Sequence, residues 1–347
     1  MNLRHNPLGR GTVRVSELGF GAAAIGNLFT AVSDEQAAQV VAAAWEAGVR
    51  YFDTAPHYGL GLSERRLGDA LRAMPRDEYV LSTKVGRILE PVTPDGDDLA
   101  NDLANDLANG FANDLANGFA VPADHRRRWD FSAEGVRRSI EESLTRLGLD
   151  RIDLAYLHDP DDHAEQALTE AYPELERLRA EGVIGAIGIG MNQADLPARF
   201  VRETDIDAVL LAGRYSLLDQ RGLAELLPLA AEHGVGVVVG GVFNSGLLAD
   251  PKPGATFDYA AAPDELVDRA LRLKSICERH GVPLRAAALR FPFGHPAVAS
   301  VLVGTRSAAE VRDAAAMLNH PVPEGLWTEL KERGLLPAEA PTPGEAA

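Results

Sequence analysis

The strongest constraint on the fold is a regular alternation of short apolar runs with longer helical patterns. Runs with strand character occupy residues 18–25, 49–53, 80–84, 152–158, 184–191, 208–212, 235–242 and 298–304. Helical patterns occupy residues 34–47, 63–73, 133–147, 164–181, 193–202, 223–233, 262–280 and 307–319. Apolar strands that alternate with helices are typical of a parallel sheet covered by helices. Eight such units predict an α/β fold, a single-domain (β/α)8 (TIM) barrel over residues 10–325.

Local signals at the predicted helix ends agree with this alternation. Ser33 and Gln36 have the spacing of a capping box, in which side chains satisfy backbone N–H groups at a helix start. Gly48, Gly182 and Gly234 lie just past predicted helix ends, where a positive φ favours glycine. An open, doubly wound sheet is the structural alternative, but no Gly-x-Gly-x-x-Gly motif follows the first strand.

Two segments depart from the alternation. Residues 98–120 repeat a four-residue unit of the type Asp-Leu-Ala-Asn, which glycines interrupt. Asn, Asp and Gly disfavour a helix interior, so we expect a poorly ordered loop with at most a short helix. Its position after the third strand leaves two interpretations open, a tolerated insertion and a lid over the substrate. Residues 337–347 are rich in Pro, Ala and Glu, which predicts a disordered tail.

Charge and cysteine content exclude several classes of protein. The formal net charge is -17 and no basic patch is present, which argues against nucleic acid or anionic membranes as partners. The chain has no run of about 18 apolar residues and no apolar signal core near Met1. The single cysteine, Cys277, cannot form an internal disulfide, so we expect a cytoplasmic protein. We expect a monomer or a small homo-oligomer.

Four ionisable residues stand at or just past predicted strand ends: Asp53, Tyr58, Lys84 and His158. The parallel strands of a barrel end on one face, so these side chains are expected to meet there. A phenol has a pKa near 10, and an ammonium such as Lys84 lowers it, which lets Tyr58 exchange a proton. Asp53 can hold Lys84 in place, and His158 can hydrogen-bond the oxygen whose charge changes. This set predicts proton transfer in carbonyl or alcohol chemistry.

Other interpretations of the same residues remain open. Taken singly, each of the four has a structural role as its simplest explanation, so the prediction rests on their joint placement. The segment His158-Asp-Pro-Asp-Asp-His163 offers metal ligands and would suit a metal-dependent barrel hydrolase. Such barrels commonly use a His-x-His pair, which the sequence lacks, so we predict no metal.

A family resemblance strengthens the prediction. The segment Tyr51-Phe-Asp-Thr-Ala-Pro-His-Tyr-Gly59, followed by Ser63-Glu64 and Leu67-Gly68, resembles the second-strand signature of the aldo-keto reductases. The resemblance extends over residues 15–319, nearly the whole chain. It implies that the four ionisable residues form the catalytic tetrad of that family and that NAD or NADP is the cofactor.

The same resemblance implies cofactor contacts in the second half of the chain. The segment Ile187-Gly-Ile-Gly-Met-Asn192 resembles the fifth-strand motif, which gives Asn192 a contact with the nicotinamide carboxamide. The other cofactor-binding residues that it implies are Tyr215, Gly241, Phe243, Asn244, Gly246, Leu248, Gly304, Thr305, Arg306 and Glu310. Two positions depart from the family pattern, because Ala212 replaces a frequent Gln and Gly240 a frequent aromatic residue. Backbone N–H groups of the glycine-containing loop can still approach the phosphates.

Three further segments are similar to one branch of the family, which oxidises the C1 of an aldose to a lactone and includes pyridoxal dehydrogenases. They are Trp129-Asp-Phe-Ser132, Ala212-Gly-Arg-Tyr-Ser-Leu-Leu218 and Phe243-Asn-Ser-Gly246. Glu310 stands where NADP enzymes often have Arg, and a carboxylate there would repel a 2′-phosphate, whereas Arg306 could accept one. We therefore expect an NAD-preferring aldose dehydrogenase that tolerates NADP. General aldehyde or ketone reduction, pyridoxal oxidation and a redox-sensing regulatory subunit are the alternatives.

Overall fold

Eight parallel strands close into a barrel in the computed structural model, which describes residues 3–92, 113–258 and 260–344. In their order around the barrel they are β3 Leu18–Gly21, β4 Tyr51–Asp53, β5 Val80–Val85, β8 Ile152–His158, β9 Ile184–Met191, β10 Ala208–Ala212, β11 Gly236–Gly240 and β14 Val298–Gly304. Each of them coincides with one of the predicted apolar runs. The prediction of a single-domain (β/α)8 barrel is therefore confirmed.

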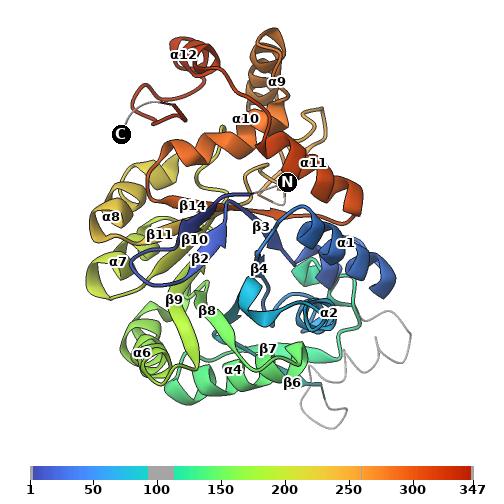
Figure 1. Cartoon of the computed structure of the whole chain (residues 1–347), viewed down its shortest axis with the longest axis vertical. Coiled ribbons are helices and arrows are strands. Elements are labelled where there is room, and N and C mark those ends of the chain that lie inside the picture. Colours follow the sequence, from blue (N-terminus) through green and yellow to red (C-terminus); the bar gives the residue numbers. More distant parts are fainter. Residues whose placement is uncertain (1–2, 93–112, 259, 345–347) are drawn as a thin grey trace.

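Helices surround the strands, as Figure 1 shows. Their bounds are α1 Asp34–Glu46, α2 Leu62–Leu71, α4 Ala133–Leu147, α5 Ala164–Gln166, α6 Tyr172–Ala180, α7 Asp195–Glu203, α8 Leu226–His233, α9 Asp264–Arg279, α10 Leu284–Arg290, α11 Ala308–Leu318 and α12 Glu324–Glu332. A π-helical segment, Ala167–Ala171, joins α5 to α6, so the helix predicted over residues 164–181 contains a wide turn. Helices α10 and α12 were not predicted from the sequence. Both are short and begin directly after Pro283 and Pro323.

The predicted helix ends are confirmed. The Ser33 hydroxyl accepts a hydrogen bond from the Gln36 backbone N–H at 3.1 Å, which is one of the two bonds of a capping box. Gly48, Gly182 and Gly234 adopt φ angles of 94°, 76° and 66°. These local signals therefore set where the helices begin and end.

Three of the predicted catalytic residues lie near the carboxyl ends of neighbouring strands. Asp53 pairs with Ser82 across β4 and β5, and Lys84 pairs with Tyr156 across β5 and β8. His158, the last residue of β8, pairs with Gly190 of β9. The strands are parallel, so these residues share the carboxyl-end face, where barrel enzymes have their active sites.

A short hairpin closes the opposite end of the barrel. It consists of β1 His5–Pro7 and β2 Arg14–Ser16. Leu8, Val13 and Val15 pack with buried side chains inside the barrel, among them Tyr51 and Tyr156. The backbone at Gly9 lies directly against that of Asp207, just before β10. The barrel interior is thus filled from the amino-terminal end, which leaves the carboxyl-end face for a site.

The end of the predicted insertion packs on the barrel. Residues 98–112 lie outside the described residues, whereas 113–120 contain a single 3-10 turn, η3 Asp114–Asn117. Ala120 N donates to the Asn27 carbonyl at 2.9 Å, and Asn27 Nδ2 donates to the Ala120 carbonyl at 3.1 Å. Phe119 is 2% exposed. The sequence allowed a short helix, and η3 is one. The poorly ordered loop expected for residues 113–120 is wrong, because the buried Phe119 side chain and the hydrogen bonds between Asn27 and Ala120 fix the backbone.

The predicted disordered tail is also packed over residues 337–344. Ala340 and Thr342 are buried, and the Pro341 carbonyl lies 2.3 Å from where a Cβ on Gly294 would stand. Glycine at position 294 therefore admits the tail. Small side chains fit such a close contact, and proline lowers the entropy that the chain loses when it becomes ordered. Composition alone does not reveal that the barrel offers the tail a place to pack. Residues 345–347 lie outside the described residues.

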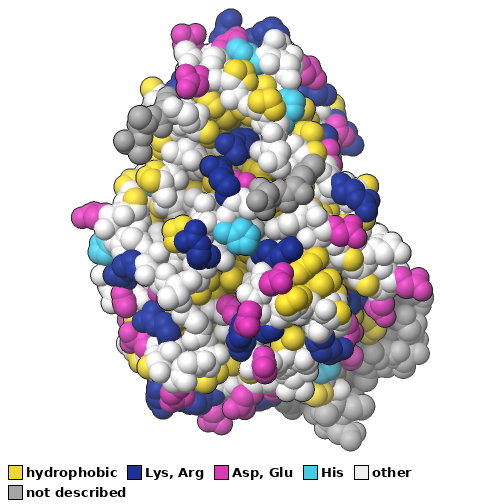
Figure 2. Space-filling model, in the orientation of Figure 1, with side chains coloured by type: hydrophobic (Ala, Val, Ile, Leu, Met, Phe, Trp, Pro, Cys, Tyr) yellow, Lys and Arg dark blue, Asp and Glu magenta, His cyan; other side chains and the backbone are white. Residues whose placement is uncertain are grey.

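Charged side chains of both signs are interspersed on the face that Figure 2 shows. Ion pairs are frequent among the described residues, and those of Arg199 with Glu165 and Glu203 are examples. Within the described part of the chain, no helix has the length and apolar character needed to cross a lipid bilayer.

Candidate active site

The predicted catalytic residues come together at the carboxyl ends of β4, β5 and β8. Lys84 Nζ donates to Asp53 Oδ2 at 2.6 Å and to the Thr54 carbonyl at 2.9 Å. Ser82 Oγ donates to the other carboxylate oxygen, Asp53 Oδ1, at 2.7 Å. The side chains of Asp53 and Lys84 are each 2% exposed. The ammonium is therefore held in one position, with two oxygen acceptors and no freedom to move into solvent.

Tyr58 and His158 lie next to this ion pair. The turn after β4 places Tyr58, whose backbone N–H donates to the Ala55 carbonyl at 3.1 Å. Lys84 Nζ lies 4.6 Å from the centroid of the Tyr58 ring. The rings of Tyr58 and His158 are perpendicular, with centroids 6.0 Å apart. Asp53, Tyr58, Lys84 and His158 thus form one group, named here the catalytic cluster.

Charge is fixed by the buried pair at the base of the cluster. Burial opposes the Lys84 ammonium, but Asp53, followed by Tyr58, outweighs burial and raises the pKa of Lys84. Burial raises the pKa of Asp53, while Lys84 and Ser82 act in the opposite direction. Because each oxygen of Asp53 accepts a hydrogen bond from a close donor, we treat the two side chains as an ion pair.

The pKa of Tyr58 is shifted in the direction opposite to the prediction. Burial raises the pKa of Tyr58, and the opposing effect of Lys84 is smaller, partly because Asp53 also raises it. The predicted net lowering is therefore wrong, although Lys84 acts in the predicted direction. The physical reason is that burial removes water from the phenolate and destabilises it. Lys84, which is already paired with Asp53, stabilises the phenolate by less than this loss. Tyr58 consequently carries its proton at neutral pH, which suits donation to a carbonyl oxygen.

Two neutral imidazoles stand beside Tyr58. Burial, followed by Arg87, holds the pKa of His158 well below its usual range. Burial also lowers the pKa of His57 to about 2, and the two imidazole centroids are 5.7 Å apart. A neutral imidazole offers one donor and one acceptor. His158 can therefore donate a hydrogen bond to a reacting oxygen without adding a charge.

The predicted cofactor-binding residues Thr305, Arg306 and Glu310 adjoin one another at the start of α11. Ser307 caps the helix, and Glu310 Oε2 accepts from the Arg306 backbone N–H at 2.6 Å. Gln36 Nε2 donates to the Arg306 carbonyl at 2.7 Å. Thr305 Oγ1 and Arg306 Nε are buried and find no hydrogen-bond partner among the described residues. Buried polar atoms without partners are costly, so a polar ligand fits at this place.

Other predicted cofactor residues are open at the same face. Asn192 and Gly304 are exposed just after β9 and at the end of β14. In the loop after β11, Phe243 is half-buried, and Gly241 and Gly246 are exposed with φ angles of 63° and 93°. A Cβ on Gly246 would meet no atom within 4 Å, so the backbone here borders open space. A phosphate could approach these N–H groups closely.

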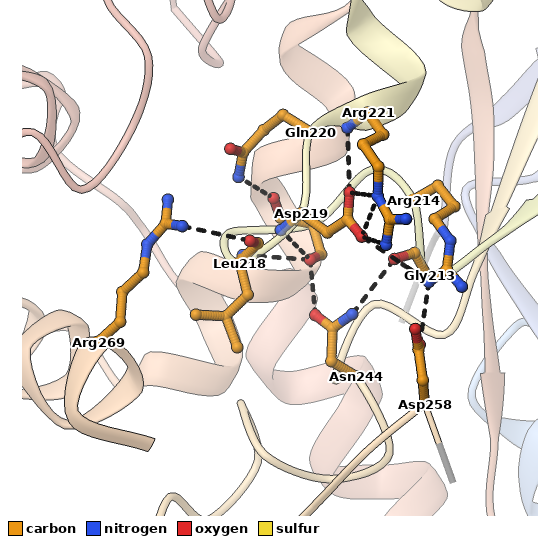
Figure 3. Close-up of polar contacts among 10 residues, drawn as sticks. Gly213, Arg214, Leu218, Asp219, Gln220, Arg221, Asn244, Asp258 and Arg269 are labelled. Carbon is orange, nitrogen blue, oxygen red and sulfur yellow. Dashed lines mark hydrogen bonds and ion pairs between the residues drawn. The ribbon is translucent and has the colours of Figure 1, made fainter. Parts of the chain in front are cut away.

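Polar contacts join the loops after β10 and β11, as Figure 3 shows. Ser216 Oγ donates to Asn244 Oδ1 at 2.6 Å, and Asn244 Nδ2 donates to the Gly213 carbonyl at 3.3 Å. Arg214 Nη1 donates to Asp258 Oδ1 at 2.9 Å. The Asn244 side chain therefore holds the two loops together, and its contact with a cofactor stays a prediction.

Tyr215 and Leu248, also predicted to contact the cofactor, are fully buried. The Tyr215 ring packs against Phe291 with centroids 5.1 Å apart. Both side chains belong to the main hydrophobic core. They support the cofactor loops from within, and any direct contact with a nucleotide stays a prediction.

The structure adds side chains that the sequence analysis missed as site residues. Arg127 pairs with Asp114 at 2.5 Å and donates to the His57 carbonyl at 2.9 Å, which ties η3 to the site. The Phe119 ring lies 5.2 Å from that of His57 and 6.1 Å from that of Tyr58. The last repeat of the insertion thus forms a wall beside Tyr58. Only its position after the third strand pointed to this role.

Arg87 and Asp159 were missed as well, although each lies close in sequence to a predicted residue. Arg87 follows Lys84 by three positions, and Asp159 directly follows His158. The Arg87 guanidinium contacts the Asp159 carboxylate, and Asp159 Oδ2 lies 3.6 Å from His158 Nε2. Their closeness in sequence to Lys84 and His158 was the signal that could have identified them.

The segment considered as a metal site has a different environment. The His163 ring lies 5.6 Å from that of Trp129 and 5.7 Å from that of Phe131. Within the described ranges, no group of three or more His, Cys, Asp or Glu residues could hold a metal ion.

Comparisons with known proteins agree with this geometry. Residues 17–333 match the model of the Aldo/keto reductase family. The chain is similar to a D-threo-aldose 1-dehydrogenase of Pseudomonas sp, with 51% identity over 93% of this chain and 95% of that protein. It is also similar to pyridoxal 4-dehydrogenase of Microbacterium luteolum, with 42% identity over 95% of this chain and 97% of that protein.

A solved structure extends the comparison to three dimensions. The holo form of an aldo-keto reductase from Bacillus halodurans superposes with a TM-score of 0.72 and 27% sequence identity, covering 95% of this chain and 96% of that one. The family match spans most of the chain, the barrel is the one that the resemblance implied, and the four residues of the predicted tetrad lie together. The chain therefore belongs to the aldo/keto reductase family and is an oxidoreductase.

Proposed function

We propose that this oxidoreductase converts an aldose to its lactone, with a nicotinamide nucleotide as hydride acceptor. The observation that carries the proposal is the catalytic cluster, in which a phenol, an anchored ammonium and a neutral imidazole adjoin one another. The 51% identity to a D-threo-aldose 1-dehydrogenase supports a sugar as the substrate.

In this proposal Tyr58 takes the proton of the C1 hydroxyl. His158, as a neutral donor, hydrogen-bonds the same oxygen, and Lys84 stabilises the phenolate that Tyr58 must become before it accepts a proton. When bound, the oxidised nicotinamide supplies the carbon that receives the hydride. Asp53 keeps Lys84 beside the ring throughout.

The cofactor lies, in this proposal, along the face formed by the ends of β9, β11 and β14. Thr305 Oγ1 and Arg306 Nε would gain partners there, and the open backbone at Gly246 would face the phosphates. We propose that NAD is preferred, because the Glu310 carboxylate would repel a 2′-phosphate. The guanidinium of Arg306 would allow NADP to bind more weakly.

Reduction of an aldehyde is the second candidate, and the raised pKa of Tyr58 favours it. A phenol that carries its proton at neutral pH is ready to protonate a carbonyl oxygen, which is the reverse reaction. The 42% identity to a pyridoxal 4-dehydrogenase also makes pyridoxal a substrate to test.

The test is to follow NADH and NADPH formation with L-fucose, D-arabinose, L-galactose and pyridoxal. Rapid NADH formation with an aldose supports the proposal and the cofactor preference. Tyr58→Phe should lose nearly all turnover while it still binds NADH, since only the exchangeable proton is removed. Silence on every sugar, with reduction of simple aldehydes by NADPH, would replace the proposal with the second candidate. Cofactor binding without turnover on any substrate would instead indicate a redox-sensing barrel.

A further inference from the structure

A hairpin beside the catalytic cluster holds Arg87 over the site. It consists of β6 Arg87–Pro91 and β7 His125–Trp129, in which Arg87 pairs with Trp129. The Arg87 Cζ atom lies 4.3 Å from the centroid of the Trp129 ring. Phe131 stacks on the same indole at 6.1 Å and 20°. The indole therefore fixes the plane of the guanidinium, and the Arg87 side chain is only 12% exposed.

Asp159 reaches the same place from β8. Its backbone is left-handed, with φ 43°, a conformation that costs a residue with a Cβ free energy. The backbone N–H still pairs with the Gly190 carbonyl at 3.0 Å, so the turn starts directly beyond the sheet. This conformation brings the carboxylate to Arg87 and to within 3.6 Å of His158 Nε2.

The pair has hydrogen-bonding capacity that the catalytic roles do not use. Arg87 Nε is buried, and no described residue hydrogen-bonds it. An ionised carboxylate only accepts hydrogen bonds, and a guanidinium only donates them. A hydroxyl can satisfy both at once, because it donates to Asp159 and accepts from Arg87.

We propose that Arg87 and Asp159 bind the 2-hydroxyl of the substrate and so determine specificity for 2-hydroxy aldehydes and aldoses. This inference rests on the proposed function. With the reacting oxygen on His158 Nε2, the carboxylate 3.6 Å from that nitrogen would reach the substituents of the neighbouring atom. In a cyclic aldose C1 has two such neighbours. The ring oxygen cannot donate to a carboxylate, whereas the hydroxyl on C2 can.

The test compares two sugars that differ only at this position. D-Arabinose has a 2-hydroxyl, and 2-deoxy-D-ribose is the same sugar without it. A hydrogen bond to a charged group predicts that the protein prefers D-arabinose by about 10- to 100-fold in kcat/KM. In Asp159→Asn this ratio should fall several-fold or more towards one, and Arg87→Lys should lower it in the same direction. The ratio is measured within one preparation, so partial misfolding of a variant does not affect it.

Asp161→Asn is the matched control. It removes the same charge two residues away, where Asp161 accepts from Gln193 Nε2 at 2.5 Å outside the pair. Its ratio should match that of the unmodified protein. A ratio near one in the unmodified protein, or a ratio that Asp159→Asn leaves intact, would overturn the inference while aldose oxidation stands.

The two proposals can fail separately. If no sugar is oxidised, the proposed function fails, and the inference is tested by reduction of glyceraldehyde against 3-hydroxypropanal, which lacks the 2-hydroxyl. A preference for glyceraldehyde that Asp159→Asn lowers supports the pair as a 2-hydroxyl site. Equal rates with the two aldehydes would reject it.

Discussion

Replacing Lys84 with Met should destabilise the protein by breaking a fully buried ion pair. The change leaves the Asp53 carboxylate inside the barrel with Ser82 as its remaining donor. Loss of one partner of such a pair costs about 3–5 kcal/mol. With about 2.1 cal/mol/K of unfolding entropy per residue, the 347 residues correspond to about 0.7 kcal/mol/K. The expected fall in Tm is therefore about 4–7 °C.

The destabilisation should also depend on pH with a defined sign. Burial raises the pKa of Asp53, and the Lys84→Met change removes the main opposing influence, so the folded pKa lies above the unfolded value near 3.9. A group raised in this way contributes stability below its unfolded pKa and loses it as pH rises through the folded pKa. The Tm deficit of Lys84→Met should therefore grow as pH rises above the unfolded pKa of Asp53.

Thermal unfolding followed by circular dichroism at several pH values measures both effects. Asp53→Asn combined with Lys84→Met provides the matched comparison, because it leaves no charge in the pair. The double variant should be less destabilised than the sum of the single changes by about 1–3 kcal/mol. A Tm loss below about 1 °C, a deficit that does not change with pH, or additive single changes would each refute the reasoning.

Three further predictions concern activity. Aldose oxidation should accelerate as pH rises from 6 towards 10, because the pKa of Tyr58 is raised and only the phenolate accepts a proton. A kcat/KM that does not change with pH would contradict this role of Tyr58. Phe119→Ala should raise KM for sugars and lower the free energy of unfolding by about 3–5 kcal/mol, because it removes a buried ring beside Tyr58. An unchanged KM in steady-state assays would show that this ring does not face the substrate. Glu310→Arg should raise the NADP-to-NAD ratio of kcat/KM at least several-fold, and the lost hydrogen bond to the Arg306 backbone should lower Tm slightly. A constant ratio would mean that the 2′ position of the cofactor does not lie near Glu310.

The barrel and the catalytic cluster were predictable because their signals are local. Each strand and helix has its own hydrophobic period, and the strands of a parallel barrel end on one face whatever the loops do. That rule is sufficient to bring Asp53, Lys84 and His158 together from distant positions. The cofactor contacts stay predictions, since Tyr215 and Asn244 were assigned from a motif that does not specify where a side chain points.

Tertiary structure decided the features that depend on what surrounds a residue. The pKa of Tyr58 follows from how much water burial removes, and a sequence does not state burial. The pairing of Arg87 with Asp159 depends on a hairpin and a left-handed turn that bring two loops together. Phe119 lies in a repeat whose composition predicts disorder, yet it packs because the barrel offers it a partner surface. Local pattern thus determined the architecture and the meeting of the predicted reacting groups. Their proton affinity depends on which distant segments exclude water from them, which only the tertiary structure decides.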